Sequence, residues 1–147
     1  MSTLTVRTAT LYDLERVVEC DPSAAVDDDR RAFLTAATVA GECRVAVEAD
    51  TIVGFAVTTP RRFFDRAFLE LLMVAPSTRR HGVGRALLRD AVQSADGPGV
   101  WTSTNRSNAP MQGLLASEGW TFSGELVGLD DGDPELFFRT DLGHRDP

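Results

Sequence analysis

The spacing of hydrophobic residues along this chain changes several times between the period of a strand and that of a helix. Short runs with strand character lie at 4–7, 44–48, 51–57, 67–74, 100–104, 121–127 and 135–140. Apolar residues at helical spacing predict four helices, one after Thr10, one after the acidic stretch 27–29, one after the loop 75–83 and one beginning at Pro110. This order of elements predicts an α+β domain.

Each predicted helix has one apolar face, which we expect to be buried. These faces carry Leu11, Leu14, Val17 and Val18; Phe33, Leu34 and Ala37; Leu87, Leu88, Ala91 and Val92; and Met111, Leu114 and Leu115. The first two long strands should form a hairpin with its turn at Ala49-Asp50, followed by a polar break at Pro60-Arg61-Arg62. The run Ala67–Val74 is almost continuously apolar, as in a strand covered on both faces, and Glu70 is its one charge.

The length and composition fit one globular domain. The 147 residues, 43% of them hydrophobic and 25% charged, suit a single domain over 1–147 with a loose tail at about 141–147. No apolar run approaches the roughly 20 residues that a membrane helix needs, and the first residues lack the pattern of a secretory signal. Cys20 and Cys43 have no metal-ligand spacing. We therefore expect a cytoplasmic protein with reduced thiols and no metal.

The net charge of −7 narrows the expected partners. Binding to nucleic acid or to a membrane surface depends on clustered Lys and Arg, so neither partner is expected. A cationic small substrate fits this charge better than an anionic one. The charge is equally compatible with the simple role of keeping the protein soluble.

The segment 74–88 differs from the rest because a buried strand runs through a glycine-containing loop into a helix. Gly82 and Gly84 lack Cβ atoms, so their N–H groups can approach an anion closely. The first turn of the following helix adds unpaired donors and the positive end of a dipole. Charges suited to phosphate oxygens stand on three arginines, Arg79, Arg80 and Arg85. The loop is therefore a candidate cradle for a pyrophosphate.

Two common phosphate-binding motifs do not fit this loop. The dinucleotide fingerprint G-x-G-x-x-G would need glycine or alanine at the position of Leu87. The sequence contains no G-K-[ST], which excludes a P-loop.

The hexapeptide Arg79-Arg80-His81-Gly82-Val83-Gly84 resembles the [RQ]-x-x-G-x-[GA] motif of the GNAT superfamily of acyltransferases. Its context is similar to that family as well. Val74-Ala75-Pro76 ends the preceding strand, paired leucines open the following helix, and the downstream segment from Asn108 to Gly119-Trp120 matches a second family pattern. The resemblance covers essentially the whole chain.

The resemblance implies a GNAT-type fold with a mixed central sheet of six to seven strands and about four flanking helices, splayed between the Glu70 strand and the Trp101 strand. It also implies acetyl-CoA as co-substrate, with its pantetheine arm in the splay and its pyrophosphate on the amides of 79–84. The residues implied in cofactor binding are Leu72, Met73, Val74, Arg79, Arg80, His81, Gly82, Val83, Gly84, Arg85, Asn105 and Asn108.

For some polar residues after the Trp101 strand, a structural role is the alternative to binding the cofactor or a cation. Asn105 and Asn108 either hold the pantetheine arm or fix the loop, and Asn108 can also cap the last helix. Asp130, Asp131 and Asp133 either recognise a cation or form a solvated turn.

Acetyl transfer to an amine needs a base that accepts a proton from the ammonium form, and Glu70 is the catalytic candidate. It lies on the strand that should border the cleft, among apolar residues that would partly remove its carboxylate from water. Loss of hydration favours the protonated form of a carboxylate and so makes it a better proton acceptor. The alternative is a salt bridge from Glu70 to Arg62 or Arg66.

The general acid of many GNAT enzymes is a tyrosine, and it is missing here from its usual place. Within a pattern like N-x-x-A-x-x-x-Y-x-x-x-G-F, alignment of Asn108 and Gly119 puts Leu115 where the tyrosine stands. The only tyrosine, Tyr12, belongs to the first helix. The thiolate then leaves with help from water, Ser117 or a helix dipole, or the protein is a poor enzyme.

These features predict an N-acetyltransferase that passes acetyl from acetyl-CoA to a small-molecule or peptide primary amine. Direct attack in a ternary complex is expected because neither cysteine lies near the motif. A non-catalytic acyl-CoA-binding regulatory module and a protein or peptide N-acetyltransferase stay open as alternatives. Action on charged transfer RNA is disfavoured by the acidic balance. A homodimer formed through the last strands is also left open.

Overall fold

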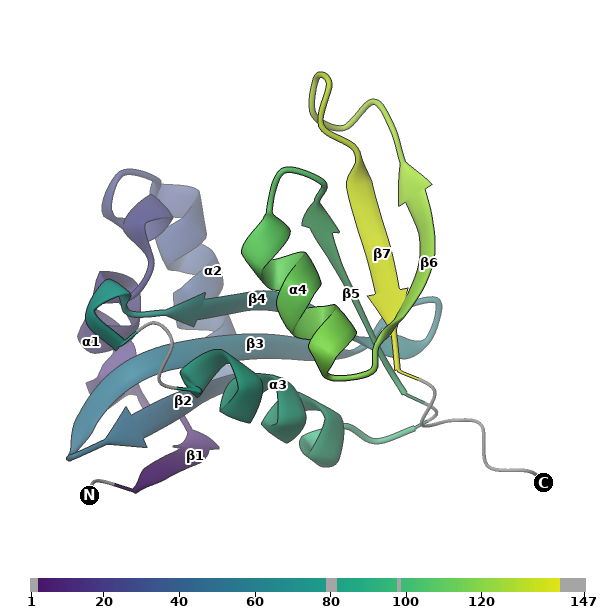
Figure 1. Ribbon diagram of the computed structural model, residues 1–147. Coiled ribbons are helices and arrows are strands. Elements are labelled where there is room, and N and C mark those ends of the chain that lie inside the picture. The colour runs from purple at the N-terminus through teal and green to yellow at the C-terminus, as the bar shows by residue number, and fades with distance from the viewer. Residues whose placement is uncertain (1–2, 79–81, 98, 141–147) are drawn as a thin grey trace. The chain divides into compact units, whose positions relative to one another are not determined.

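The computed structural model describes residues 3–78, 82–97 and 99–140 (Figure 1). Its strands are β1 (Leu4–Thr8), β2 (Cys43–Glu48), β3 (Thr51–Phe63), β4 (Arg66–Val74), β5 (Val100–Asn105), β6 (Thr121–Leu126) and β7 (Glu135–Arg139). Its α-helices are α1 (Leu14–Glu19), α2 (Asp28–Val39), α3 (Val83–Ser94) and α4 (Ala109–Ser117). The strand order is β1-β2-β3-β4-β5-β7-β6, with β4 parallel to β5. Within the described residues, seven strands in a mixed sheet and four α-helices confirm the predicted α+β fold class.

The chain divides into two compact units, and the long strands β3 and β4 contribute residues to both. Unit 1 contains Met1–Thr58 and Leu71–Ala91, and unit 2 contains Thr59–Glu70 and Val92–Pro147. A single domain over 1–147 stays a prediction. The expected tail at 141–147 lies outside the described residues.

The apolar core of unit 1 joins α1 and α2 to one face of β2 and β3. Val45 and Phe55 are paired across the two strands, and both are fully buried. Val17 of α1 and Leu34 of α2 belong to the same buried cluster. Two residues that the helical spacing predicts to be buried are exposed, Leu11 at 59% and Phe33 at 36%. These predictions are wrong because Leu11 lies in a short 3-10 turn before α1, and because the buried side of α2 is centred on Leu34, one residue further round the helix.

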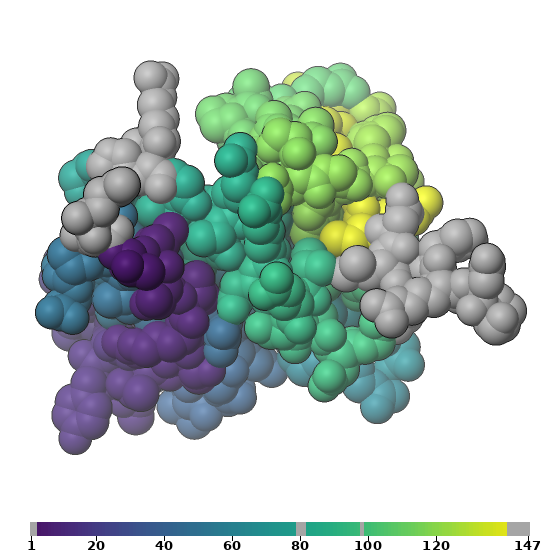
Figure 2. All heavy atoms as spheres, turned by 60° about the horizontal axis from the view of Figure 1, so that its bottom comes forward, coloured from purple at the N-terminus to yellow at the C-terminus, as the bar shows by residue number. Residues whose placement is uncertain are grey.

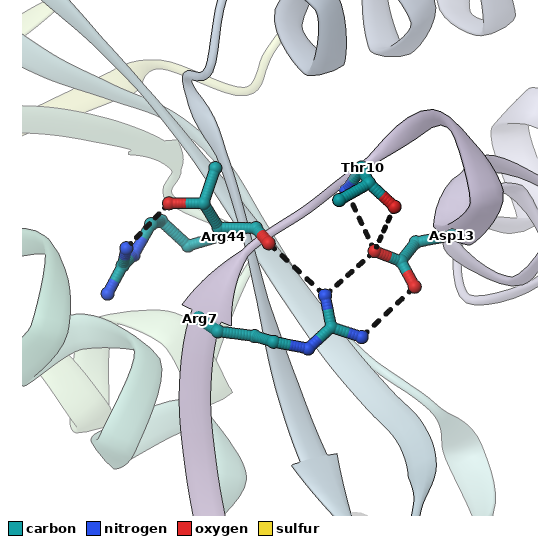
Figure 3. Close-up of polar contacts among 5 residues, drawn as sticks. Arg7, Thr10, Asp13 and Arg44 are labelled. Carbon is teal, nitrogen blue, oxygen red and sulfur yellow. Dashed lines mark hydrogen bonds and ion pairs between the residues drawn. The ribbon is translucent and has the colours of Figure 1, made fainter.

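The first two helical segments begin at residues that the sequence marks as caps. Thr10 donates its main-chain N–H to Asp13 Oδ2 over 2.8 Å at the turn before α1 (Figure 3). Asp27 accepts hydrogen bonds from the N–H groups of Asp29 and Arg30, at 2.9 and 3.3 Å, where α2 begins. The acidic stretch 27–29 thus serves a helix N-terminus, where negative charge is favourable.

The opposite face of the unit 1 strands carries small residues, and α3 packs there. Ala46 and Gly54 are paired, and they lie on this face because they alternate with Val45 and Phe55. The buried residues of α3 in this unit are Val83, Leu87, Leu88 and Ala91. The outer side of α3 is exposed and forms part of the molecular surface (Figure 2).

β3 is longer than the sequence predicts. The strand continues through Pro60-Arg61-Arg62, where a break was expected, and ends at Phe63. These three residues are exposed, so this part of the strand has no need of apolar side chains. Arg61 has a φ of 57°, an irregularity of the kind at which a strand tolerates proline. The predicted turn at Ala49-Asp50 is confirmed, with positive φ at both residues as in a two-residue hairpin loop.

The sheet of unit 2 has one buried face and one half-buried aromatic face. The buried residues alternate along β5 and β7 and comprise Val100, Thr102, Thr104, Leu136 and Phe138. On the other face the ring centroid of Phe63 lies 5.2 Å from Phe68, 5.3 Å from Trp101 and 5.6 Å from Phe137. Ring contacts at these separations stabilise a fold by about 0.5–1.5 kcal/mol each beyond their buried area.

Candidate active site

The N-terminal end of α3 offers main-chain donors that the helix itself does not use. The first helical hydrogen bond runs from Ala86 N to Gly82 O over 3.1 Å, so the N–H groups of residues 82–85 have no acceptor within the helix. Gly82 is exposed and has a φ of +80°. Apart from its chain neighbours, no described atom lies within 4 Å of the place where its Cβ would be. The turn therefore combines a glycine in the left-handed region with the positive end of a helix dipole, and both features favour an anion.

Only some of the remaining loop residues belong to the described part of the chain. Those outside the described part of the chain are Arg79, Arg80 and His81. Val83 is buried and anchors the first turn of α3, while Gly84 is half-buried and Arg85 is exposed beside it. The structure therefore brings Gly82, Gly84 and Arg85 to one helix end.

The start of the loop is fastened to β3 by contacts that sequence reasoning missed. Ala75 N donates to Val53 O over 2.8 Å. The Thr78 hydroxyl lies 3.0 Å from Ala75 O and 3.3 Å from Val53 O. Gly54, the next residue on β3, faces α3 at very close range. An isolated glycine within an apolar strand is the signal that could have indicated this approach.

The end of β4 is apolar but only partly covered. Leu72, Met73 and Val74, which the resemblance implies in cofactor binding, are all half-buried. Earlier on the same strand, Ala67 and Leu69 are buried, with 4% and 2% exposed. Ala67 and Leu69 share one face of the strand, whereas Phe68 on the other face is half-buried. The expectation of a strand covered on both faces is therefore wrong, because β4 is fully covered on one face only, and there only at its beginning.

Glu70 is held in place by its neighbours. Its Oε2 accepts a hydrogen bond from Thr59 Oγ1 over 3.1 Å and lies 3.7 Å from Arg62 Nε. Its side chain is 19% exposed. Of the two predicted ion-pair partners, Arg62 is thus confirmed, whereas Arg66 donates to the main-chain oxygen of Phe64 instead. The carboxylate is oriented by a hydroxyl and is still accessible.

β4 and β5 pair in parallel at their beginnings. The register joins Ala67–Leu69 to Val100–Thr102. At the last of these pairs the Thr102 hydroxyl donates to Leu69 O over 2.8 Å, and Thr102 is buried. A side chain here supplies a donor to a strand carbonyl, which must be satisfied when it is buried. The sequence held no signal for this role, because threonine is also simply a good strand former.

Polar side chains at the end of β5 and in the turn that follows it bind other parts of the chain. Asn105 Nδ2 donates to Asp130 Oδ2 over 2.8 Å. Asp133 accepts from Ser107 N at 3.0 Å and from Ser107 Oγ at 2.6 Å. Asn108 Oδ1 accepts from the N–H of residue 111 over 3.2 Å and so caps α4. Two of the three loop aspartates thus fasten the β6–β7 connection to the β5–α4 turn, and both asparagines have the structural roles that were left open for them.

No described hydroxyl takes the place of the missing tyrosine on α4. Leu115 is fully buried. Ser117, two residues on, is exposed and donates its hydroxyl to Leu114 O over 2.8 Å. Tyr12 is 99% exposed and belongs to unit 1.

Neither cysteine is available as a nucleophile. Cys20 and Cys43 are free and buried. Burial raises the pKa of the Cys43 thiol to about 11 and also raises the pKa of Cys20. In the described ranges no group of three or more His, Cys, Asp or Glu side chains could hold a metal ion. None of the helices placed by the structure is both long and apolar enough to cross a membrane.

The sequence matches a family model described as Acetyltransferase (GNAT) family over residues 9–120. No curated protein matches it significantly. Among solved structures, it is similar to a GNAT-family acetyltransferase from Bacillus cereus ATCC 10987, with 33% identity, 95% of this chain and 97% of that chain covered, and a TM-score of 0.88.

Two further structures are alike in fold at lower identity. YncA, a putative acetyltransferase from Salmonella typhimurium solved with its cofactor acetyl-CoA, shares 23% identity over 98% of this chain and 96% of that chain, with a TM-score of 0.78. Diaminobutyrate acetyltransferase EctA from Paenibacillus lautus, solved with L-2,4-diaminobutyric acid and coenzyme A, shares 20% identity over 100% of both chains, with a TM-score of 0.77.

Proposed function

Because the chain belongs to the GNAT acetyltransferase family, we propose that it transfers acetyl from acetyl-CoA to a primary amine by direct attack in a ternary complex. The observation that carries this proposal is the open first turn of α3, with Gly82 in the left-handed region and the N–H groups of 82–85 unused by the helix. Such a turn suits the two phosphates of a pyrophosphate.

Unit 1 would hold the donor. The N–H groups of 82–85 bind the pyrophosphate, and Arg85 adds positive charge beside it. The half-buried apolar residues Leu72, Met73 and Val74 border the pantetheine arm, which would cover them. Roles for Arg79, Arg80 and His81 at the same pyrophosphate are part of the proposal. Asn105 and Asn108 act indirectly, since their amide groups already bind the chain.

Unit 2 would provide the base. The amine must be neutral to attack, and Glu70 takes the proton from its ammonium form, directly or through one water. The amine nitrogen then bonds to the thioester carbon, the carbon–sulfur bond breaks, and the electron pair leaves with sulfur. The nitrogen, now positively charged, gives its extra proton to water, which leaves a neutral amide. Glu70 is suited to this work because Thr59 fixes its carboxylate while part of it stays accessible. The two buried, unionised cysteines support direct transfer over an acyl-enzyme.

The leaving thiolate takes its proton from water in this proposal. Leu115 has no hydroxyl to give, and the Ser117 hydroxyl already donates to the main chain of α4. A coenzyme A thiolate is stable enough to leave without a dedicated acid, so transfer can continue at a lower rate.

Leu115 also favours a second candidate, a non-catalytic module that binds acyl-CoA and regulates a partner. Both candidates share the donor site and differ in whether thiol is released. The acceptor of the catalytic candidate is a small-molecule amine or the amine of a peptide. EctA acts on a small diamino acid, which supports the small-molecule class without identifying the compound.

Two measurements test the proposal in turn. Isothermal titration with coenzyme A should show saturable binding, and no heat at millimolar ligand would end both candidates. A panel of primary amines and short peptides is then incubated with acetyl-CoA, and free thiol is measured. Thiol release above background hydrolysis with at least one amine supports the enzyme, whereas binding without release across the panel supports the regulatory module.

A further inference from the structure

Gly54 is the fourth residue of β3 and lies inside the strand, where glycine weakens it. Its φ is not in the left-handed region, so its main-chain geometry does not require glycine. A Cβ here would lie 2.7 Å from Met73 O, 3.0 Å from Val83 Cγ1 and 3.2 Å from Leu87 Cδ1. The nearest of these is a main-chain oxygen, which cannot rotate away as a side chain can. Glycine is required because β4 and α3 approach β3 too closely for any side chain.

The atoms around Gly54 belong to two segments of the proposed donor site. Met73 is one of the β4 residues that border the pantetheine arm. Val83 is the first residue of α3 and follows Gly82 directly. The partner of Gly54 on β2 is Ala46, which is fully buried, so the sheet under the first turn of α3 presents almost no side-chain volume. One added methyl group would press on both donor segments.

A second contact fixes α3 further along its length. Arg44 of β2 donates from Nε and Nη2 to the two carboxylate oxygens of Asp90 on α3, at 2.9 and 2.7 Å. Its Nη1 donates to Thr8 Oγ1 on β1 at 2.9 Å. The Asp90 side chain is only 15% exposed. A bidentate pair with this little solvent fixes direction as well as distance.

The two contacts act on the same side of the helix. Val83, Leu87 and Asp90 are separated by four and three residues, so they form one stripe along α3. Asp90 is seven residues beyond Val83, which is about 10 Å along the axis. A helix held at its first turn and again two turns later can neither roll nor slide on the sheet.

We propose that Gly54 and the Arg44–Asp90 pair are positioning residues for acetyl-CoA. Gly54 sets how closely the first turn of α3 approaches β4, and Arg44 with Asp90 sets the rotation of that turn. None of the three contacts the reacting atoms, because they act through α3. This inference rests on the proposed function, since it takes the N–H groups of 82–85 as the pyrophosphate site.

The test compares two donors, acetyl-CoA and acetyl-pantetheine, which has the same thioester and arm but no pyrophosphate. The measured quantity is kcat/KM for acetyl-CoA divided by kcat/KM for acetyl-pantetheine. A variant that only loosens the fold lowers both values and leaves their ratio unchanged. Misplacement of α3 costs the pyrophosphate contacts, which only acetyl-CoA makes, whereas pressure on Met73 affects both donors and leaves their ratio unchanged. Gly54→Ala should therefore lower the ratio about tenfold and Asp90→Asn about threefold.

Matched controls carry the same substitutions at exposed positions. Gly113→Ala lies on α4, where a Cβ meets no described atom within 4 Å, and Asp96→Asn follows α3. Both controls should keep the wild-type ratio. If Gly54→Ala does not fold, Asp90→Asn decides by itself. A wild-type ratio in folded Asp90→Asn or in folded Gly54→Ala would overturn the positioning role. If the wild type uses both donors equally well, the pyrophosphate of acetyl-CoA makes no useful contact. That result would contradict the proposed pyrophosphate site itself, and the proposed function would lose its main support.

Discussion

Unit 1 and unit 2 are built for different parts of the proposed reaction. In unit 1 the groups proposed to bind the pyrophosphate belong to the main chain, namely the N–H groups of residues 82–85. In unit 2 the proposed base is a side chain, and side chains there are held by other side chains. Thr59 holds Glu70, and Ser103 donates its hydroxyl to Glu135 over 2.6 Å.

This difference explains why the sequence indicates how the acetyl donor is bound but not which amine accepts the acetyl group. Main-chain groups point together only when consecutive residues allow it, so an anion site of this kind leaves a contiguous motif. Side chains on neighbouring strands meet from distant places in the chain, and Ser103 and Glu135 are 32 residues apart. The motif therefore indicates the acetyl donor. The amine acceptor cannot be predicted in this way, because it would be bound by side chains that vary freely on one fold.

The largest expected effect is on the proposed base in unit 2. Glu70→Gln keeps the size of the side chain and its contact with Thr59 but removes the proton acceptor, so kcat should fall about 100-fold. KM for acetyl-CoA should change little, because Glu70 is not one of the residues proposed to bind the donor. Steady-state rates of thiol release at saturating amine measure both constants.

Glu135→Gln is the matched control for this substitution. Glu135 is also half-buried and also accepts a hydrogen bond from a hydroxyl, but it lies on β7. It should keep kcat within a factor of about three, since it is not the base. An equal loss in both variants would mean that the charge of this sheet face, and not proton acceptance by Glu70, controls the rate.

The next effect concerns the main chain of unit 1. Gly82→Ala puts a side chain at a φ of +80°, which costs roughly 1–2 kcal/mol and turns the neighbouring N–H groups away. KM for acetyl-CoA should rise about tenfold. Gly132→Ala is the control, because Gly132 has a φ of +71° and equally open surroundings in the β6–β7 connection. Thermal melting should show similar destabilisation in the two variants, with the change in KM confined to Gly82→Ala.

The smallest effect should come from a side-chain contact of unit 1. The hydrogen bond from Arg7 lowers the pKa of Asp13 from its ordinary 3.8 to about 2 (Figure 3). The charged carboxylate therefore stabilises the fold above pH 3.8, and this contribution is lost as the pH falls through about 2. Because Arg7 is half exposed, solvent limits the contribution to about 1 kcal/mol.

Urea unfolding of the wild type and of Asp13→Asn measures this contribution directly. The wild type should be more stable by about 1 kcal/mol at pH 5, and the difference should fall to a small fraction of this value at pH 2 and vanish below it. Asp131→Asn, at an exposed turn in unit 2, should match the wild type throughout. A difference between wild type and Asp13→Asn that is undiminished at pH 2 would contradict the assignment to the charged pair.

The sequence predicted most elements and the family correctly. The match over residues 9–120 confirms the GNAT prediction, and the strands and helices occur in the expected order. The spacing of hydrophobic residues failed to predict the second half of β3. Pro60-Arg61-Arg62 continue this strand although they are polar or strand-breaking, because they are exposed to solvent. The spacing also misplaced Phe33, because a helix face defined by spacing has an uncertainty of about one residue.

The site was predictable only in part, for a physical reason. The motif identified the turn at Gly82, but Gly54 became meaningful only when Met73 and α3 were seen to lie against it. The amide of Asn105 could equally have held a ligand, and only the folded chain shows that Asp130 accepts its hydrogen bond. The assignments of Glu70 and of the donor residues stay predictions.

The N–H groups of residues 82–85 can be observed one by one in the ¹⁵N–¹H spectrum of the labelled protein. Saturation with coenzyme A should shift the amide signals of Gly82, Val83, Gly84 and Arg85 strongly, and saturation with pantetheine, which lacks the pyrophosphate, should leave them nearly unmoved. Amides that stay in place while coenzyme A binds elsewhere on the protein would contradict a pyrophosphate site at this turn.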